Sequence, residues 1–175
     1  MKAARLLLAL ALGAAAVAPE LTRYAAERRL AVASEAFRIL LQSPQSAEDP
    51  IAALDRVATL AETASDSLPG DPRPWVLSGS AHLTAGRPER ALESYAAAFD
   101  RAGERAEVDL NIGRAEALLA REDRARAAFL RAGWISPALL RALPPETAQP
   151  LLAEVARVEA ELRAGQLKSP PPPPR

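Results

Sequence analysis

Residues 79–98 read GSAHLTAGRPERALESYAAA and residues 113–132 read GRAEALLAREDRARAAFLRA, and these two stretches decide the fold. They lie 34 residues apart (113 minus 79), and their matching pairs are Gly79 with Gly113, Gly86 with Ala120, Ala91 with Ala125, Tyr95 with Phe129 and Ala98 with Ala132. A fixed period of this length indicates stacked helical hairpins, because one such unit cannot bury its apolar face alone. The chain is therefore predicted to be a helical repeat protein that binds another molecule.

The matching positions resemble those of the tetratricopeptide repeat (TPR) family when Trp75 is taken as the fourth residue of the first copy. In that family, small residues at positions 8, 20 and 27 let two antiparallel helices approach closely, and an aromatic residue at position 24 fills the gap between hairpins. The residues that carry the resemblance are Trp75, Gly79, Gly86, Ala91, Tyr95 and Ala98 in the first copy, and Gly113, Ala125, Phe129 and Ala132 in the second. The resemblance implies antiparallel hairpins stacked as a short right-handed solenoid.

The second copy departs from the first at two positions, where Asp109 replaces Trp75 and Ala120 replaces Gly86. The residues before the first copy also fit a degenerate repeat. Its positions 20, 24 and 27 would be Val57, Ala61 and Ala64. The pattern leaves open whether this earlier unit is a true repeat.

Helix-start and helix-stop residues set the expected boundaries. Asp71 can cap a helix that begins near Pro72, and Gly86 can take the left-handed conformation that ends it before Pro88 starts the next helix. The expected hairpins are 73–85 with 88–102, and 104–119 with 122–133, with Gly103 and Gly133 as breaks.

The flanking segments also have helical periodicity. Apolar residues recur at three- and four-residue steps between Pro19 and Ser43, after Pro50, and from Leu151 to Leu162 before Gly165. No segment alternates with a period of two, so we expect an all-α chain without a sheet. The predicted organisation is 1–18 signal peptide or membrane anchor, 19–68 helical pair, 69–137 two TPR-like repeats, 138–166 capping helices and 167–175 disordered Pro-rich tail.

The N-terminus resembles a bacterial signal peptide. Lys2 and Arg5 precede an uncharged run over 6–18, which has the length of a signal-peptide core and is short for crossing a bilayer. Cleavage after Ala16 is favoured over cleavage after Ala18, because Pro19 would follow the second cut. The globular part is expected to be periplasmic or secreted, or tethered to the inner membrane facing the periplasm if the segment is retained. A cytoplasmic chain with an apolar first helix is the alternative.

Composition removes several classes of function. The 22 basic and 22 acidic residues balance. The sequence has no stripe of basic residues that would indicate binding to nucleic acid. With no cysteine, the chain has no disulfide, no thiolate metal site and no thiol nucleophile. We expect no cofactor and no metal, and membrane contact only through residues 1–18 if they are uncleaved.

No residue pattern supports catalysis. His82, the only histidine, falls at repeat position 11, which is a packing position in the family. Ser78 and Ser80 flank Gly79 within a helix, without a nucleophile elbow or a base in sequence reach. The chain is predicted not to be an enzyme.

The family resemblance implies that the first helix of each hairpin lines a concave groove. The candidate partner-binding residues on it are Arg73, Val76, Ser80, Leu83, Leu110, Asn111, Arg114 and Leu118. Asn111 matches one residue of the family's carboxylate clamp, but Val76 and Ser80 replace two others, so no clamp is predicted. Ordinary solvated surface is an equally good interpretation of these residues.

The favoured function is a non-catalytic adaptor or scaffold of the cell envelope that binds a protein or peptide segment through this face. The first alternative is a structural accessory subunit of an envelope assembly, such as polysaccharide or secretion machinery. An unrecognised hydrolase, which would depend on His82, is the weaker one. The sequence does not determine the partner or the oligomeric state.

Overall fold

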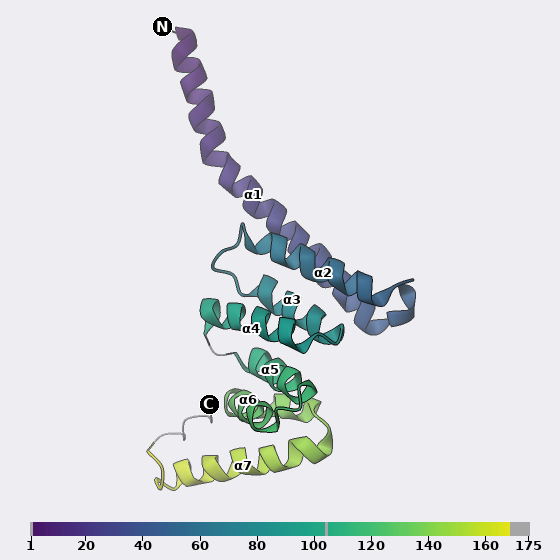
Figure 1. The fold of residues 1–175 in the computed structure, drawn as a ribbon. Coiled ribbons are helices and arrows are strands. Elements are labelled where there is room, and N and C mark those ends of the chain that lie inside the picture. The colour runs from purple at the N-terminus through teal and green to yellow at the C-terminus, as the bar shows by residue number, and fades with distance from the viewer. Residues whose placement is uncertain (1, 104, 169–175) are drawn as a thin grey trace.

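The computed structural model describes residues 2–103 and 105–168, with the side chains of residues 17–45, 47–103 and 105–168. Its elements are α1 (Lys2–Gln42), η1 (Pro44–Ser46), α2 (Pro50–Ser65), α3 (Arg73–Thr84), α4 (Pro88–Ala102), α5 (Ala106–Leu118), α6 (Glu122–Ile135), η2 (Pro137–Ala142) and α7 (Pro145–Arg163). No strand occurs over these residues. Figure 1 shows the helices stacked in chain order from α1 to α7, each packed on the next. The predicted all-α stack of helical hairpins is confirmed.

The helices of the two repeats begin and end close to the predicted residues because local capping chemistry is decisive there. Asp71 Oδ1 accepts from the backbone N–H of Arg73 at 2.9 Å, which stabilises the start of α3. Gly86 has φ of 72° between α3 and α4, and Gly103 has φ of 69° after α4. Both glycines therefore have a positive φ, which glycine adopts without steric penalty, and ψ of −160° at Gly103 turns the chain away from the helix.

The two copies share one packing device, in which a glycine of the first helix faces an aromatic ring of the second. A Cβ atom added to Gly79 would lie 2.6 Å from a ring carbon of Tyr95, and one added to Gly113 would lie 2.4 Å from Phe129. Both rings are buried. The ring thus fills the space that a side chain at the glycine would occupy. This explains why the glycine and the aromatic residue recur together.

The turns that close the two hairpins differ in strain. Gly86 is replaced by Ala120 in the second copy, and Ala120 keeps a positive φ of 54°. A Cβ atom disfavours this left-handed conformation. The second turn therefore carries backbone strain that the first avoids.

Exchanging these two residues is expected to move stability in opposite directions. Gly86→Ala should cost about 1 kcal/mol and Ala120→Gly should gain about 0.5–1 kcal/mol, because only glycine takes this conformation without steric penalty. A Cβ at position 86 meets nothing within 4 Å, so the backbone effect is isolated there. Urea unfolding of both variants measures the effect, and changes of the same sign would contradict the strain at Ala120.

The N-terminal helix is longer than predicted. It was expected to begin after Pro19, whereas α1 begins at Lys2 and Pro19 lies inside it. The alanines and leucines that precede Pro19 are strong helix formers, so they sustain the helix despite the missing proline N–H. Among the described side chains, the first that is buried is Ala26.

The N-terminal unit packs α1 against α2. Val57, Ala61 and Ala64 are buried, as positions 20, 24 and 27 of a degenerate repeat would be. However, the segment from Ser43 to Asp49 separates the two helices, and it is longer than the turns at Gly86 and Ala120. The unit is therefore a helical hairpin with its own connection.

The C-terminal cap consists of η2 and α7. Leu140, Leu151 and Val155 pack with Leu110 and Phe129 in one buried cluster. Gly133 was predicted to break α6, but the helix continues to Ile135. A Cβ at Gly133 would lie 2.6 Å from Leu140, so this glycine admits η2 and does not end the helix. Of the tail predicted at residues 167–175, residues 169–175 lie outside the described part of the chain.

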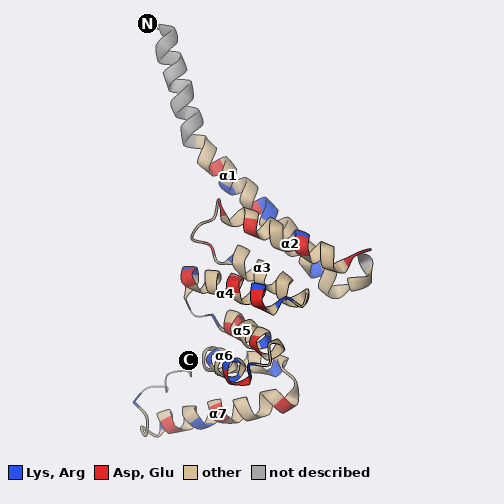
Figure 2. Cartoon of the chain, viewed as in Figure 1, with Lys and Arg blue, Asp and Glu red and all other residues tan. Residues whose placement is uncertain are grey.

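Charges of both signs are distributed over the described helices, as the blue and red segments in Figure 2 show. The largest departure from the repeat pattern is Asp109, which is 1% exposed in α5. Its Oδ1 accepts from Arg131 Nε of α6 at 2.8 Å.

In the described part of the chain, no helix combines the length and apolar character needed to span a membrane.

Candidate functional site

A polar cluster joins α3, α4 and α5 on the face predicted to bind a partner. Tyr95 is completely buried, and its hydroxyl lies 3.3 Å from Ser80 Oγ. Ser80 Oγ donates to the Val76 carbonyl at 2.8 Å, so Tyr95 is the donor in the contact between the hydroxyls. Burial raises the pKa of Tyr95 to about 12 despite opposing effects of Ser80, Arg114 and Asn111. We call Ser80, Tyr95, Asn111 and Arg114 the α3–α5 face.

The α5 half of this face is held in place by Arg114. Its Nη1 donates to Asn111 Oδ1 at 3.1 Å, and its Nη2 donates to the Ala142 carbonyl at the end of η2 at 3.3 Å. The side chain of Asn111 is also hydrogen-bonded to the Tyr95 hydroxyl, which opposes the rise of the Tyr95 pKa. Arg114 therefore orients Asn111 and joins α5 to the cap.

Alkaline conditions are expected to destabilise the fold through Tyr95. Its pKa is about 12 in the folded chain and about 10 when unfolded, so the unfolded state loses the proton first. The stabilising contribution is complete below about pH 10 and is lost as pH rises to about 12, which amounts to roughly 2–3 kcal/mol. Between about pH 9 and 11.5, Tyr95→Phe should lose about 2 kcal/mol less stability to urea than the wild type. Equal losses would contradict the burial of the hydroxyl.

Arg73 is engaged by two carboxylates. It pairs with Asp71 beside it and with Glu27 of α1, whose Oε1 lies 2.8 Å from Arg73 Nη2. The bond from Arg73 lowers the pKa of Asp71, and the same two carboxylates raise the pKa of Arg73. Arg73 therefore links α3 to α1, and binding an acidic ligand there would compete with both pairs.

The apolar candidates fall into three environments. Leu110 is 4% exposed and belongs to the core, so it is not available to a partner. Val76 and Leu83 are half-buried against Ala91 and Tyr95. Leu118 is exposed at the end of α5. The structure thus brings Ser80, Asn111 and Arg114 together, but leaves Leu118 outside the cluster and removes Leu110 from the surface.

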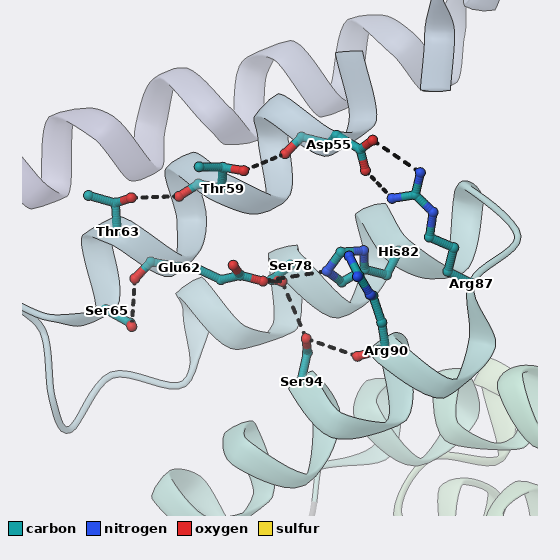
Figure 3. Close-up of polar contacts among 10 residues, drawn as sticks. All are labelled: Asp55, Thr59, Glu62, Thr63, Ser65, Ser78, His82, Arg87, Arg90 and Ser94. Atoms are coloured by element: carbon teal, nitrogen blue, oxygen red, sulfur yellow. Dashed lines mark hydrogen bonds and ion pairs between the residues drawn. The ribbon is translucent and has the colours of Figure 1, made fainter. Parts of the chain in front are cut away.

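An open cleft of about 860 Å³ lies between α2 and α4, with α3 at its base. Its lining residues are Asp55, Ala58, Thr59, Glu62, Trp75, His82, Arg87, Arg90, Glu93 and Ser94. Figure 3 shows most of the polar members. Trp75 and His82 were interpreted from the sequence as structural residues of the repeat, and the cleft itself was not predicted.

Glu62 is the central acceptor of the cleft. Its Oε1 accepts from Ser78 Oγ at 2.7 Å and lies 3.4 Å from His82 Nε2 (Figure 3). Ser78 is completely buried and His82 is 7% exposed. The prediction that His82 is a packing residue agrees with this burial.

The grouping of serine, histidine and carboxylate is not arranged for nucleophilic attack. In a catalytic triad the histidine lies between the serine and the carboxylate and accepts the serine proton. Here the carboxylate of Glu62 lies between the other two, and the Ser78 hydroxyl donates to it. Because Ser78 is also completely buried, the geometry favours a hydrogen-bonded link from α2 to α3.

The far end of the cleft is closed by the ion pair of Asp55 and Arg87, which lowers the pKa of Asp55 (Figure 3). The side chains of Arg90 and Glu93 make no hydrogen bond or ion pair with any residue that the structure describes.

The signal that could have indicated the cleft is a difference between the copies. Trp75 and His82 of the first copy become Asp109 and Glu116 in the second.

The residues of the second copy that correspond to Trp75 and His82 form ion pairs. Arg121 Nη1 lies 3.2 Å from Glu116 Oε2, and Asp109 is paired with Arg131. In the first copy, Arg101 instead lies over the Trp75 ring at 4.9 Å from its centroid. At two of the positions that line the cleft in the first copy, the second copy therefore has ion-paired residues.

Over the residues described, no group of three or more histidine or acidic side chains is placed to hold a metal ion. Comparison of the chain with family models, with curated proteins and with solved structures gives no match.

Proposed function

We propose that the chain is a non-catalytic, TPR-like adaptor of the bacterial cell envelope that binds an extended peptide or protein segment on the α3–α5 face. The observation that carries the proposal is the convergence of Ser80, Asn111 and Arg114, from two helices, around the Tyr95 hydroxyl. Amide and hydroxyl groups can bond the backbone of an extended segment, while the half-buried Val76 and Leu83 offer apolar contact beside them.

The envelope location rests on the sequence of residues 1–18, which combines two basic residues with a short apolar run. Cell fractionation with mass determination of the N-terminus tests it. A periplasmic product that begins at Val17 or Pro19 supports export, and an intact Met1 in the membrane fraction supports a retained anchor. An intact cytoplasmic product would overturn the location.

Binding is tested by selecting extended peptides from a displayed random library against the purified chain. The selected peptides should bind Asn111→Arg at least 10-fold more weakly, because the long side chain covers the polar cluster and removes the amide donors. Gln149→Arg is the matched control, since it makes the same chemical change at an exposed position of α7. Equal binding by both variants would remove the α3–α5 face as the site, provided that circular dichroism shows both to be folded.

A further inference from the structure

Helix α1 has apolar side chains on two opposite faces. One face packs on α2 and contains the buried residues Ala26, Leu30 and Ala33. The other is between 43% and 62% exposed and consists of Val17, Leu21, Tyr24, Val32 and Ile39, which we call the α1 stripe. No described part of the chain covers this stripe.

The α1 stripe is one continuous seam. On a helix that turns about 100° per residue, its five positions lie within about 80° of one another. Val17 and Ile39 are separated by twice 11 residues, and Leu21 and Val32 by 11. Since an 11-residue spacing nearly equals three helical turns, it keeps side chains aligned along a long helix. Apolar residues scattered singly over a surface would not show this order.

Two opposite charges lie within the stripe. Arg28 and Glu35 occupy the same narrow sector of the helix as the apolar residues. Arg28 makes no ion pair with any residue in the described ranges. Glu35 binds Arg38 of its own helix, and its carboxylate retains further acceptor positions.

We propose that a second copy of this chain covers the α1 stripe, in an antiparallel α1–α1 pair whose two-fold axis passes between Ala31 and Val32. In an antiparallel pair, the numbers of any two facing residues have the same sum. The sequence supports this register, because 28 and 35 have the same sum as 24 and 39. Arg28 then faces the partner's Glu35, and Tyr24 faces the partner's Ile39. A parallel pair would place each charge opposite its own kind, which is unfavourable.

The same charges disfavour other occupants. A membrane surface covering the stripe would bury Arg28 in its apolar layer without an opposite charge, and would also remove the pair of Glu35 and Arg38 from water, which costs free energy. A second copy places a Glu35 opposite each Arg28, so that two such ion pairs form, one on each side of the axis. This pairing is independent of the peptide-binding function proposed above, since the stripe and the α3–α5 face are on different helices.

Charge exchange tests the pairing in the chain as purified from cells, with its N-terminus established by mass spectrometry. Sedimentation velocity over a range of concentrations should show a monomer–dimer equilibrium. Arg28→Glu should weaken it about 10-fold or more, and so should Glu35→Arg, while the double variant should recover most of the affinity. A chain that stays monomeric at all concentrations, or a double variant no better than the single ones, would overturn the proposal.

Cross-linking tests the direction of the two helices, because the chain has no cysteine of its own. A mixture of Tyr24→Cys and Ile39→Cys chains should give a mixed dimer with a short thiol cross-linker, whereas neither variant alone should react. In the antiparallel pair, each introduced thiol lies about 22 Å along the axis from its own copy in the partner. Cross-linking of Tyr24→Cys with itself would show a parallel pair and contradict the proposal.

Discussion

Gly113→Ala is expected to lower the free energy of unfolding by about 2 kcal/mol. The added methyl group would lie 2.4 Å from two ring carbons of Phe129, so the ring or the helix must move. Overpacking of this kind costs about 1–3 kcal/mol and occasionally more, and here it exceeds the roughly 1 kcal/mol that alanine gains over glycine within a helix. Gly79→Leu should cost at least as much, because its side chain would enter the ring of Tyr95. Chemical unfolding of each variant gives the values.

Gly70→Ala is the matched control, since a Cβ there meets nothing within 4 Å and should change stability by less than about 0.5 kcal/mol. Truncating the ring makes the test specific. The double variant Gly113→Ala with Phe129→Leu should be more stable than the sum of the single changes predicts, because the methyl group would occupy space that the ring has left. A Gly113→Ala protein as stable as Gly70→Ala would refute the contact between glycine and ring.

Arg131→Met is expected to destabilise the chain by about 3 kcal/mol or more. Asp109 is almost completely buried, and the replacement removes the guanidinium that binds its carboxylate at 2.8 Å. Breaking a buried ion pair by removing one partner typically costs about 3–5 kcal/mol, because the remaining charge is poorly solvated. Urea unfolding measures the loss.

The double variant Asp109→Leu with Arg131→Met separates this effect from packing. Replacing a buried ion pair by apolar groups is often neutral, so most of the lost stability should return. Arg126→Met provides the surface comparison, because its pair with Glu154 is more exposed and should contribute less than about 1 kcal/mol. If Arg131→Met costs no more than Arg126→Met, Asp109 does not depend on its partner.

The repeat architecture could be predicted from the sequence because its signals are local and occur twice. Asp71, Gly86 and Pro88 mark helix ends through their own backbone preferences, so α3 and α4 were located almost to the residue. The pairing of Gly79 with Tyr95 was visible as a recurrence, and the structure adds its physical reason, the direct contact of backbone and ring.

The predictions that were wrong concern residues with two possible roles. Glycine can end a helix or admit a neighbour, and Gly133 does the second because Leu140 of η2 packs on it. Proline usually begins a helix, but Pro19 lies inside α1. Only the packing around each residue distinguishes the two roles, and this packing is non-local.

The grouping of the residues on the proposed binding face could be predicted in part. Position along α3 and α5 correctly grouped Ser80, Asn111 and Arg114, but it could not show that Leu110 faces the core. The cleft between α2 and α4 escaped prediction because its residues come from three helices that only the stacking brings together. Its charged members have ordinary spacing on each helix, so no single segment showed that they line one space.

Tyr95 contributes both to the packing of the first hairpin and to the α3–α5 face. Its ring packs against Gly79 and joins α3 to α4, and its buried hydroxyl contacts Ser80 beneath the α3–α5 face. A molecule that binds Ser80 or Asn111 would therefore act on the same side chain that keeps the first hairpin closed. Because any ligand specific for the folded state stabilises it, occupancy there would make the neighbouring hairpins more rigid as one unit. Binding at this face would then be detectable as increased rigidity of the neighbouring hairpins, without a change of conformation.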